Sequence, residues 1–161
     1  DPRPTTMPNA DLLAIYDQAF SGASFHGAPL WGSLRGMTAE EARQRPAPGR
    51  HSPWELVLHC AYWKCIARQR ITGDLSIALP RSGANFPELP AVLHDAEWKR
   101  DRALLKREHE LLRAVIRGLA PKVLPKRAGK SRWTVRETVV GMASHDLYHA
   151  GQIQLIRKLV G

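Results

Sequence analysis

Four long stretches of the chain repeat apolar side chains every three or four positions, which is the period of an amphipathic α-helix. They predict helices at about 10–21, 53–72, 90–119 and 134–159, with a short additional helix at 38–43. No stretch alternates in the manner of paired strands. The pattern therefore predicts an all-α protein, a four-helix bundle with a long connection between its first two helices, and one domain over residues 1–161.

Three of these predicted helices begin with the same signature, a capping box. In a capping box a Ser or Thr and a Glu three residues later satisfy each other's free backbone N–H groups. The three pairs are Thr38 with Glu41, Ser52 with Glu55, and Thr134 with Glu137. We therefore expect helices to start directly after Thr38, Ser52 and Thr134.

Histidines occur on the apolar faces of two of the predicted helices. The apolar face of helix 134–159 is formed by Thr138, Met142, His145, His149, Gln152 and Ile156. The apolar face of helix 53–72 is formed by Leu56, His59, Trp63 and Ile66. Since an apolar face packs into the bundle, we expect three imidazole rings to point inward.

Three inward-facing imidazole rings require an explanation, because an unpaired buried polar group costs about 1–3 kcal/mol. His145 and His149 are one helical turn apart and can reach a common point. A divalent cation bound by these two residues and His59 would remove the cost, and a three-histidine site with an open position is typical of catalytic metal centres. The alternative is that each histidine is hydrogen-bonded separately.

The remaining histidines have weaker claims to a function. His94 and His109 lie in a strongly charged helix, so we expect both to be solvated. His51 precedes a helix and is expected to pack at its start. His26 is followed by Gly27 in a loop; a surface position is favoured, and the alternative is that it lines a pocket.

Four polar residues lie near the predicted metal ligands along the sequence. Glu55 is one turn before His59 and is a candidate general base, although its capping role is favoured. Asp146 lies about 100° around the helix from His145, so it is expected to support the site from outside the ligands or to lie at the surface. Tyr148 and Gln152 either orient a substrate or contribute to helix packing.

The charge of the chain is unevenly distributed. The net charge is +9, and the segment from Leu111 to Arg136 holds eight Lys or Arg residues and no acid. This basic segment 113–136 is interpreted either as a solvated loop, which is favoured, or as a surface that attracts an anionic cosubstrate. It contains one aromatic residue, Trp133, whereas base-stacking surfaces interleave several, so nucleic-acid binding is the least favoured function.

Composition also bears on location. No apolar run approaches the roughly 20 residues that cross a membrane, so no membrane partner is expected. Cys60 and Cys65 lie five positions apart on different faces of one predicted helix, which gives them no easy disulfide. Two reduced thiols favour a cytoplasmic protein.

Several motifs resemble those of the DinB/YfiT-like superfamily. The run from His145 to Ile153 (HDLYHAGQI) resembles the C-terminal signature of that family, and the run from His51 to His59 (HSPWELVLH) resembles its second-helix motif. Phe25-His26-Gly27, Trp98 and Trp133-Thr134-Val135 are also similar to the family pattern. The resemblance implies a four-helix bundle, frequently a homodimer, with zinc or nickel held by His59, His145 and His149.

The resemblance also implies a range of activities. Some members of the family are thiol S-transferases or isomerases with a low-molecular-weight thiol as cosubstrate, and others are regarded as metal-dependent hydrolases. We therefore expect a metal-dependent enzyme that acts on a small molecule, with thiol S-transfer as the first hypothesis and hydrolysis as the second. The alternatives are a non-catalytic bundle that binds a metal or ligand and a basic nucleic-acid-binding protein.

Overall fold

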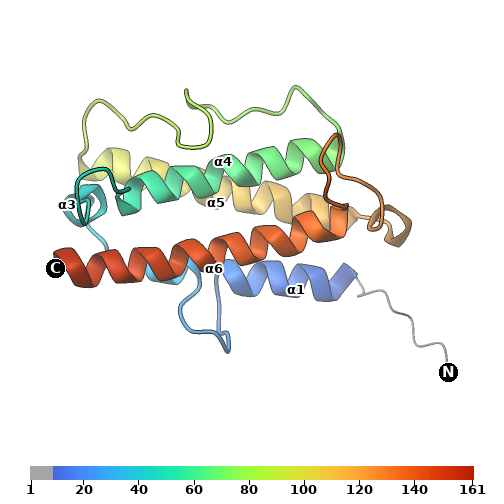
Figure 1. Ribbon diagram of the computed structural model, residues 1–161, viewed down its shortest axis with the longest axis horizontal. Coiled ribbons are helices and arrows are strands. Elements are labelled where there is room, and N and C mark those ends of the chain that lie inside the picture. Colours follow the sequence, from blue (N-terminus) through green and yellow to red (C-terminus); the bar gives the residue numbers. More distant parts are fainter. Residues whose placement is uncertain (1–8) are drawn as a thin grey trace.

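The computed structural model describes residues 9–161, and over this range the chain forms six α-helices, one 3₁₀ turn and no strand. The elements are α1 (Asn9–Phe20), α2 (Leu30–Ser33), α3 (Ala39–Arg43), α4 (Pro53–Thr72), α5 (Asp95–Gly118), η1 (Pro121–Val123) and α6 (Val135–Val160). The four long helices α1, α4, α5 and α6 lie side by side along the long axis of the molecule (Figure 1). The predicted all-α four-helix bundle is confirmed.

Local signals in the sequence account for most helix boundaries. All three capping boxes form, with the Thr38, Ser52 and Thr134 side chains each accepting from the backbone N–H three residues on. The predicted start of α5 at residue 90 is wrong, because the helix begins at Asp95 after an extended N-cap at His94. The acidic residues of the first turn of α5 favour this start by interacting with the helix dipole.

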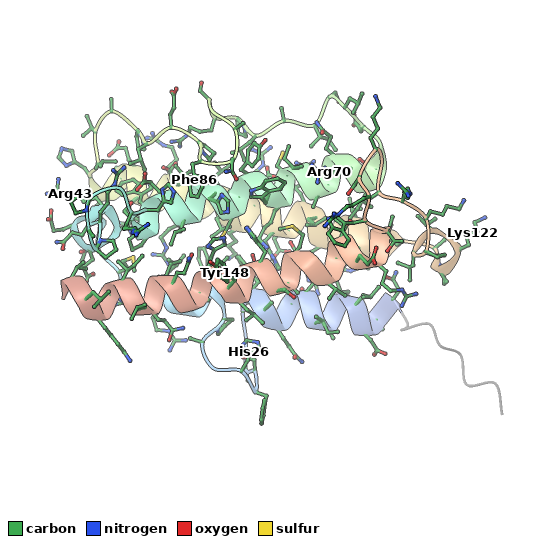
Figure 2. The ribbon with its side chains drawn as sticks, viewed as in Figure 1. His26, Arg43, Arg70, Phe86, Lys122 and Tyr148 are labelled. Atoms are coloured by element: carbon green, nitrogen blue, oxygen red, sulfur yellow. The ribbon has the colours of Figure 1, made fainter. Side chains whose placement is uncertain are left out.

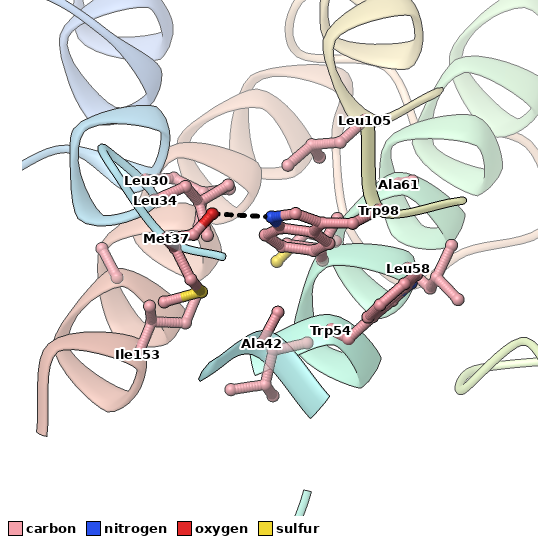
Figure 3. Close-up of a cluster of buried hydrophobic side chains, with 14 of the residues drawn as sticks. Leu30, Leu34, Met37, Ala42, Trp54, Leu58, Ala61, Trp98, Leu105 and Ile153 are labelled. Carbon is pink, nitrogen blue, oxygen red and sulfur yellow. Dashed lines mark hydrogen bonds between the residues drawn. The ribbon is translucent and has the colours of Figure 1, made fainter. Parts of the chain in front are cut away.

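The bundle interior contains two apolar clusters, one toward each end. The first cluster lies where α2 and α3 close the bundle and is built around Trp54 and Trp98 (Figure 3). The indole N–H of Trp98 donates to the carbonyl oxygen of Met37 at 2.9 Å. The second cluster includes Leu12, Leu112 and Val139 and fills the other end.

A layer of buried polar side chains separates the two apolar clusters. Lys64 of α4 and Asp146 of α6 are both fully buried and form an ion pair at 2.6 Å. The Lys64 ammonium group also donates to the Tyr16 hydroxyl at 3.4 Å. Because removing one partner of a buried ion pair costs about 3–5 kcal/mol, this pair stabilises one relative position of α4 and α6.

His109 belongs to the same layer, so the prediction that it is solvated is wrong. Its ring is 2% exposed and is stacked between the rings of Tyr16 and Phe20, with centroid distances of 4.5 and 3.7 Å. His109 lies one turn from Leu105 and Leu112, so it shares their buried face of α5. His94, in contrast, is exposed as predicted.

Two further expectations concern cysteines and membranes. Cys60 and Cys65 are free, as predicted, and both are buried, which raises the pKa of both thiols. Over residues 9–161 the structure contains no helix that is both long and apolar enough to span a membrane.

Candidate metal centre

The imidazole rings of His59, His145 and His149 converge near the middle of the bundle. The Nε2 atom of His145 lies 3.1 Å from Nε2 of His59 and 3.1 Å from Nε2 of His149. His59 comes from α4, whereas the other two come from successive turns of α6. The helix period and the α4–α6 contact therefore bring the three nitrogen atoms to one point.

Hydrogen bonds on the far side of two rings determine which nitrogen atoms carry protons. Nδ1 of His59 lies 2.7 Å from the carbonyl oxygen of Asn85, which can only accept, so this Nδ1 carries the hydrogen. Nδ1 of His149 lies 2.6 Å from Oε1 of Gln152 in the same arrangement. In the neutral rings both Nε2 atoms consequently present lone pairs toward His145.

This arrangement fits a bound cation better than it fits hydrogen bonds among the rings. Nε2 of His145 can donate at most one proton, yet it faces two acceptor nitrogens at 3.1 Å. Nitrogen ligands at about 2.0–2.1 Å from one metal ion, with angles of 90–110°, lie about 2.8–3.4 Å apart. The observed separations fall in this range, so the donor set suits a divalent ion of the zinc or nickel type.

The electrostatic surroundings keep all three rings in the metal-binding form. Burial lowers the pKa of His59, lowers that of His145 to about 3 and lowers that of His149 to about 4. Rings with these pKa values are neutral near pH 7, and a neutral imidazole is the form that coordinates metals.

The three histidines occupy the margin of the α4–α6 interface rather than its centre. The most buried positions of α6 include Val139, Ala143 and Asp146, which follow one another at intervals of four and three positions and so share one face. The face carrying His145 and His149 is therefore turned toward the edge of the bundle. At this position the three histidines can be reached from outside the apolar core.

The segment between α4 and α5, residues 73–94, completes the centre, and sequence reasoning missed this contribution. Asn85 adopts a left-handed backbone with φ of 65° and uses its side-chain oxygen to accept from the indole N–H of Trp63 at 2.8 Å. The next residue, Phe86, stacks on the rings of both His51 and His59, with centroid distances of 3.7 and 4.2 Å. An Asn-Phe pair in a loop carries no recognisable signal, since the contact to His59 is made by a backbone carbonyl.

A hollow of about 660 Å³ adjoins the centre on the side of His149. Tyr148 and Gln152, for which the sequence leaves substrate orientation and helix packing as alternatives, line it together with Phe86, and Figure 2 shows Phe86 and Tyr148 near the middle of the bundle. The side chain of Tyr148 is 65% exposed, and its ring packs edge-on against that of His149 at 5.0 Å. Within residues 9–161 no carboxylate lines this hollow, whereas Arg50 and His51 do.

Two of the predicted site residues lie elsewhere. Glu55 performs its capping role, accepting from the Ser52 N–H at 2.8 Å, and is also paired with Arg45 at 2.7 Å. His26 is exposed in a loop that projects away from the hollow (Figure 2), and its ring contacts Ser24. Neither side chain is hydrogen-bonded to any of the three histidines.

Asp146 is not a surface residue, because it forms the buried ion pair with Lys64. Carboxylate, thiol and imidazole atoms of Asp146, Cys60 and His145 lie within 4.8 Å of one another and form a second group of metal-ligand types. A cation there would lie beside the Lys64 ammonium group, and the pKa of Cys60 is well above its ordinary value because the thiol is fully buried. The second group is therefore less suited to a cation than the three histidines.

An all-α bundle with a three-histidine group between two helices defines the class of protein. Residues 26–153 match the profile of the DinB superfamily, and the chain belongs to that superfamily. The fold is similar to that of a crystal structure described as the conserved protein of locus from Enterococcus faecalis, with a TM-score of 0.62, 19% sequence identity and coverage of 94% of each chain. At this identity the likeness establishes a shared fold, and no curated protein matches the sequence.

Proposed function

We propose that this protein is a metal-dependent enzyme whose divalent ion is held by His59, His145 and His149. The observation that carries the proposal is the meeting of three neutral Nε2 atoms, two of them with lone pairs directed at the third. Membership of a superfamily whose members bind metal supports it. Zinc and nickel suit an all-imidazole ligand set.

A bound ion would supply Lewis acidity and lower the pKa of a thiol or a water that binds beside it. The chain itself contributes an apolar hollow next to His149 and a hydrogen bond from Gln152 that fixes the orientation of that ring. Phe86 stacks on the ring of His59 and covers one face of it. These residues orient the ligands and enclose a small-molecule substrate.

Thiol S-transfer is the first candidate reaction and hydrolysis the second. A hydrolase requires a general base near the attacking water. In the described part of the chain the two acids nearest in sequence are engaged elsewhere, Glu55 with Ser52 and Arg45, and Asp146 with Lys64. Arg50 and His51 beside the hollow would instead favour an anionic low-molecular-weight thiol as cosubstrate.

The proposal is tested by elemental analysis of protein purified without chelators, followed by thiol-consumption and ester-hydrolysis assays with model electrophiles. We expect about one divalent ion per chain and thiol consumption that chelator abolishes and added metal restores. Chelator-sensitive ester hydrolysis without thiol consumption would replace the first reaction by the second. Bound metal without either activity would support the non-catalytic alternative, and protein without metal would overturn the proposal.

We further propose that the protein is a homodimer that operates in the cytoplasm. Apolar side chains on one face of α6, among them Leu155 and Leu159, are more than half exposed, and they also line the hollow beside His149. A second copy packed on this face would cover the hollow. Light scattering should then give twice the mass of one chain for the native protein and a smaller mass for Leu159→Glu. The free thiols Cys60 and Cys65 fit a reducing compartment.

A further inference from the structure

A second concave surface lies at the end of the bundle where the basic segment joins α6. It consists of two adjoining hollows of about 590 and 610 Å³, which share Arg70 of α4 and Trp133 of the loop. We call this surface the Arg70 groove. Figure 2 shows Arg70 toward this end of the molecule, displaced along the bundle from Tyr148.

The basic loop that forms one wall of the Arg70 groove is fixed to the bundle. The N–H of Ala128 donates to the carbonyl of Trp133 at 3.0 Å, and the N–H of Val135 donates to that of Lys126 at 2.8 Å. Gly129 has φ of 56°, and a Cβ at this position would lie 3.3 Å from the carbonyl oxygen of Arg70. The loop backbone therefore rests directly on α4, while its basic side chains are exposed.

One end of the Arg70 groove is apolar. Trp63 and Ala67 of α4 face Val140 and Met142 of α6 across the first hollow, and Trp133 borders it. Trp133 is 47% exposed and Val140 is 36% exposed, so apolar area remains open to solvent there. Burying such area against an apolar ligand is favourable, because it removes apolar surface from water.

The other end of the Arg70 groove is positively charged. Arg70, Lys130 and Arg132 line the second hollow. Among residues 9–161 none of the three forms an ion pair; instead the guanidinium groups of Arg70 and Arg132 lie over the indole rings of Trp63 and Trp133, at 5.6 and 4.3 Å.

One acid, Glu137, borders the groove, and its carboxylate already accepts from the N–H and hydroxyl of Thr134. The lining consequently presents cationic donors with little competing negative charge. Guanidinium groups offer pairs of N–H donors whose geometry matches carboxylate, sulfonate and phosphate oxygens.

The charged end of the Arg70 groove is remote from the metal centre, whereas its apolar end reaches Trp63, whose ring lies edge-on to that of His59 with a centroid distance of 6.5 Å. Arg70 follows His59 by eleven positions in the same helix, which corresponds to about 16 Å. None of the three histidines lines either hollow of the groove. Trp63, whose indole N–H donates to the side chain of Asn85 beside the metal centre, lies at the inner end of the groove.

We propose that the Arg70 groove binds a small organic anion that has an apolar or aromatic body, with its acidic group at Arg70 and Arg132 and its body between Trp63 and Val140. The assignment does not depend on a metal ion at the histidines. It therefore adds a second site to the proposed enzyme.

The probe for this site is anilinonaphthalene sulfonate, whose fluorescence rises on binding, compared with its uncharged analogue phenylnaphthylamine. We expect Arg70→Gln combined with Arg132→Gln to weaken sulfonate binding by about 10- to 100-fold, the effect of losing charge-assisted hydrogen bonds, and to change binding of the neutral probe less than about twofold. The matched control is Arg100→Gln combined with Arg107→Gln, which removes the same two charges from exposed positions of α5 outside the groove and should leave sulfonate binding unchanged.

A second pair of variants tests the apolar end by shape. Gly141 lines the first hollow, and a Cβ there would meet no atom within 4 Å, so the side chain of Gly141→Leu starts in open space and extends into the hollow. It should weaken both probes by at least about tenfold, because a filled hollow no longer accepts the naphthalene body. Gly151→Leu adds the same side chain to the same helix, outside the groove and also in open space, and should change neither.

Further outcomes decide between sources and classes of ligand. Competition by naphthoate or by naphthyl phosphate identifies a carboxylate or a phosphate as the preferred acidic group, and either supports the site. Sulfonate binding that is weakened no more by the Arg70 and Arg132 substitutions than by the Arg100 and Arg107 substitutions would overturn it. A short single-stranded oligonucleotide that displaces the probe and loses affinity in the same variants would replace the small anion by nucleic acid. All measurements are made with chelator present, so the result stands whether or not the histidines bind metal.

Discussion

The bundle contains histidines of two kinds that are shielded from solvent to different degrees. His59, His145 and His149 meet at their Nε2 atoms, whereas His109 lies alone between the rings of Tyr16 and Phe20. Burial lowers the pKa of His109 to about 2, even further than it lowers that of His145, to about 3. By burial and pKa alone, His109 would be the stronger candidate for a functional group.

The two kinds of histidine differ in the groups that their ring nitrogens face. Nε2 of His109 lies 3.8 Å from the Asp17 carboxylate, and its Nδ1 has no hydrogen-bond partner within the described residues. No second ring nitrogen is directed at it there, and the Asp17 carboxylate is already paired with Arg113 at 2.7 Å, so His109 belongs to no group of three metal-ligand side chains among the described residues. In the three-histidine group, by contrast, lone pairs from separate helices converge. Convergence of donors, rather than a perturbed pKa, distinguishes the candidate metal centre from a packed histidine.

The largest expected effect comes from removing one converging ligand. His145→Ala should reduce metal affinity by more than about 100-fold, exceeding the 10–100-fold that loss of a supporting hydrogen bond costs, because two imidazoles remain. His109→Phe, which keeps a ring between Tyr16 and Phe20, should retain the full metal content. Elemental analysis and competition with a chromogenic chelator measure both variants. Equal metal loss in the two proteins would remove the distinction between the two kinds of histidine.

A smaller effect is expected from the residue that orients His149. Gln152→Leu removes the acceptor 2.6 Å from Nδ1 and should weaken metal binding by about 10- to 100-fold. Gln154→Leu is the matched control. Gln154 lies two positions after Gln152 in the same helix, and its side-chain amide donates to the carbonyl oxygen of Ala150. Chelator competition that gives the same affinity for both variants would show that Gln152 does not position the ring.

The smallest effect concerns His109 and pH. Its pKa of about 2 in the folded protein lies below the ordinary value of 6.5, so the unfolded chain binds the proton more readily and the free energy of unfolding falls as pH drops below about 6.5. His109→Phe removes this contribution. Between pH 7 and pH 5 the free energy of unfolding of this variant should therefore fall by about 1–2 kcal/mol less than that of the wild type. Urea unfolding in the presence of chelator measures the difference.

The groups around His109 determine the expected size of this pH effect, and the exposed His94 provides a control. Lys64 and Arg113 add to the lowering of its pKa by burial, while Asp17 is the acid within reach. His94→Phe, at the exposed start of the same helix, should reproduce the wild-type pH dependence. If the free energy of unfolding changed equally with pH in His109→Phe and in the wild type, His109 would take up its proton without unfolding of the protein.

The sequence predicted the parts of the molecule that depend on short-range periodicity. The bounds of α4 and the three capping boxes follow from residues within one or two turns of each other. The same period placed His145 and His149 on one face, and the structure brings His59 to them. The short helix α2 was not predicted, because four residues are too few to show a period.

The features that the sequence did not reveal depend on partners far away along the chain. From the sequence alone Lys64 would be expected to be solvated, because its partner Asp146 is 82 positions away along the chain. His109 has charged neighbours in sequence, but its own face of α5 packs on α1. The contact between His59 and the carbonyl of Asn85 uses a backbone atom that every residue possesses.

The same long separation has a consequence for the order of folding events. His59 and His145 are 86 positions apart, so their Nε2 atoms meet only after α4 and α6 have docked across the polar layer. Contacts of this kind form late, and a metal ion that needs all three ligands cannot speed the initial search. Its stabilising effect therefore falls mainly on the rate of unfolding. The metal-loaded protein would be distinguished by a longer lifetime in the folded state, with little change in the time it needs to fold.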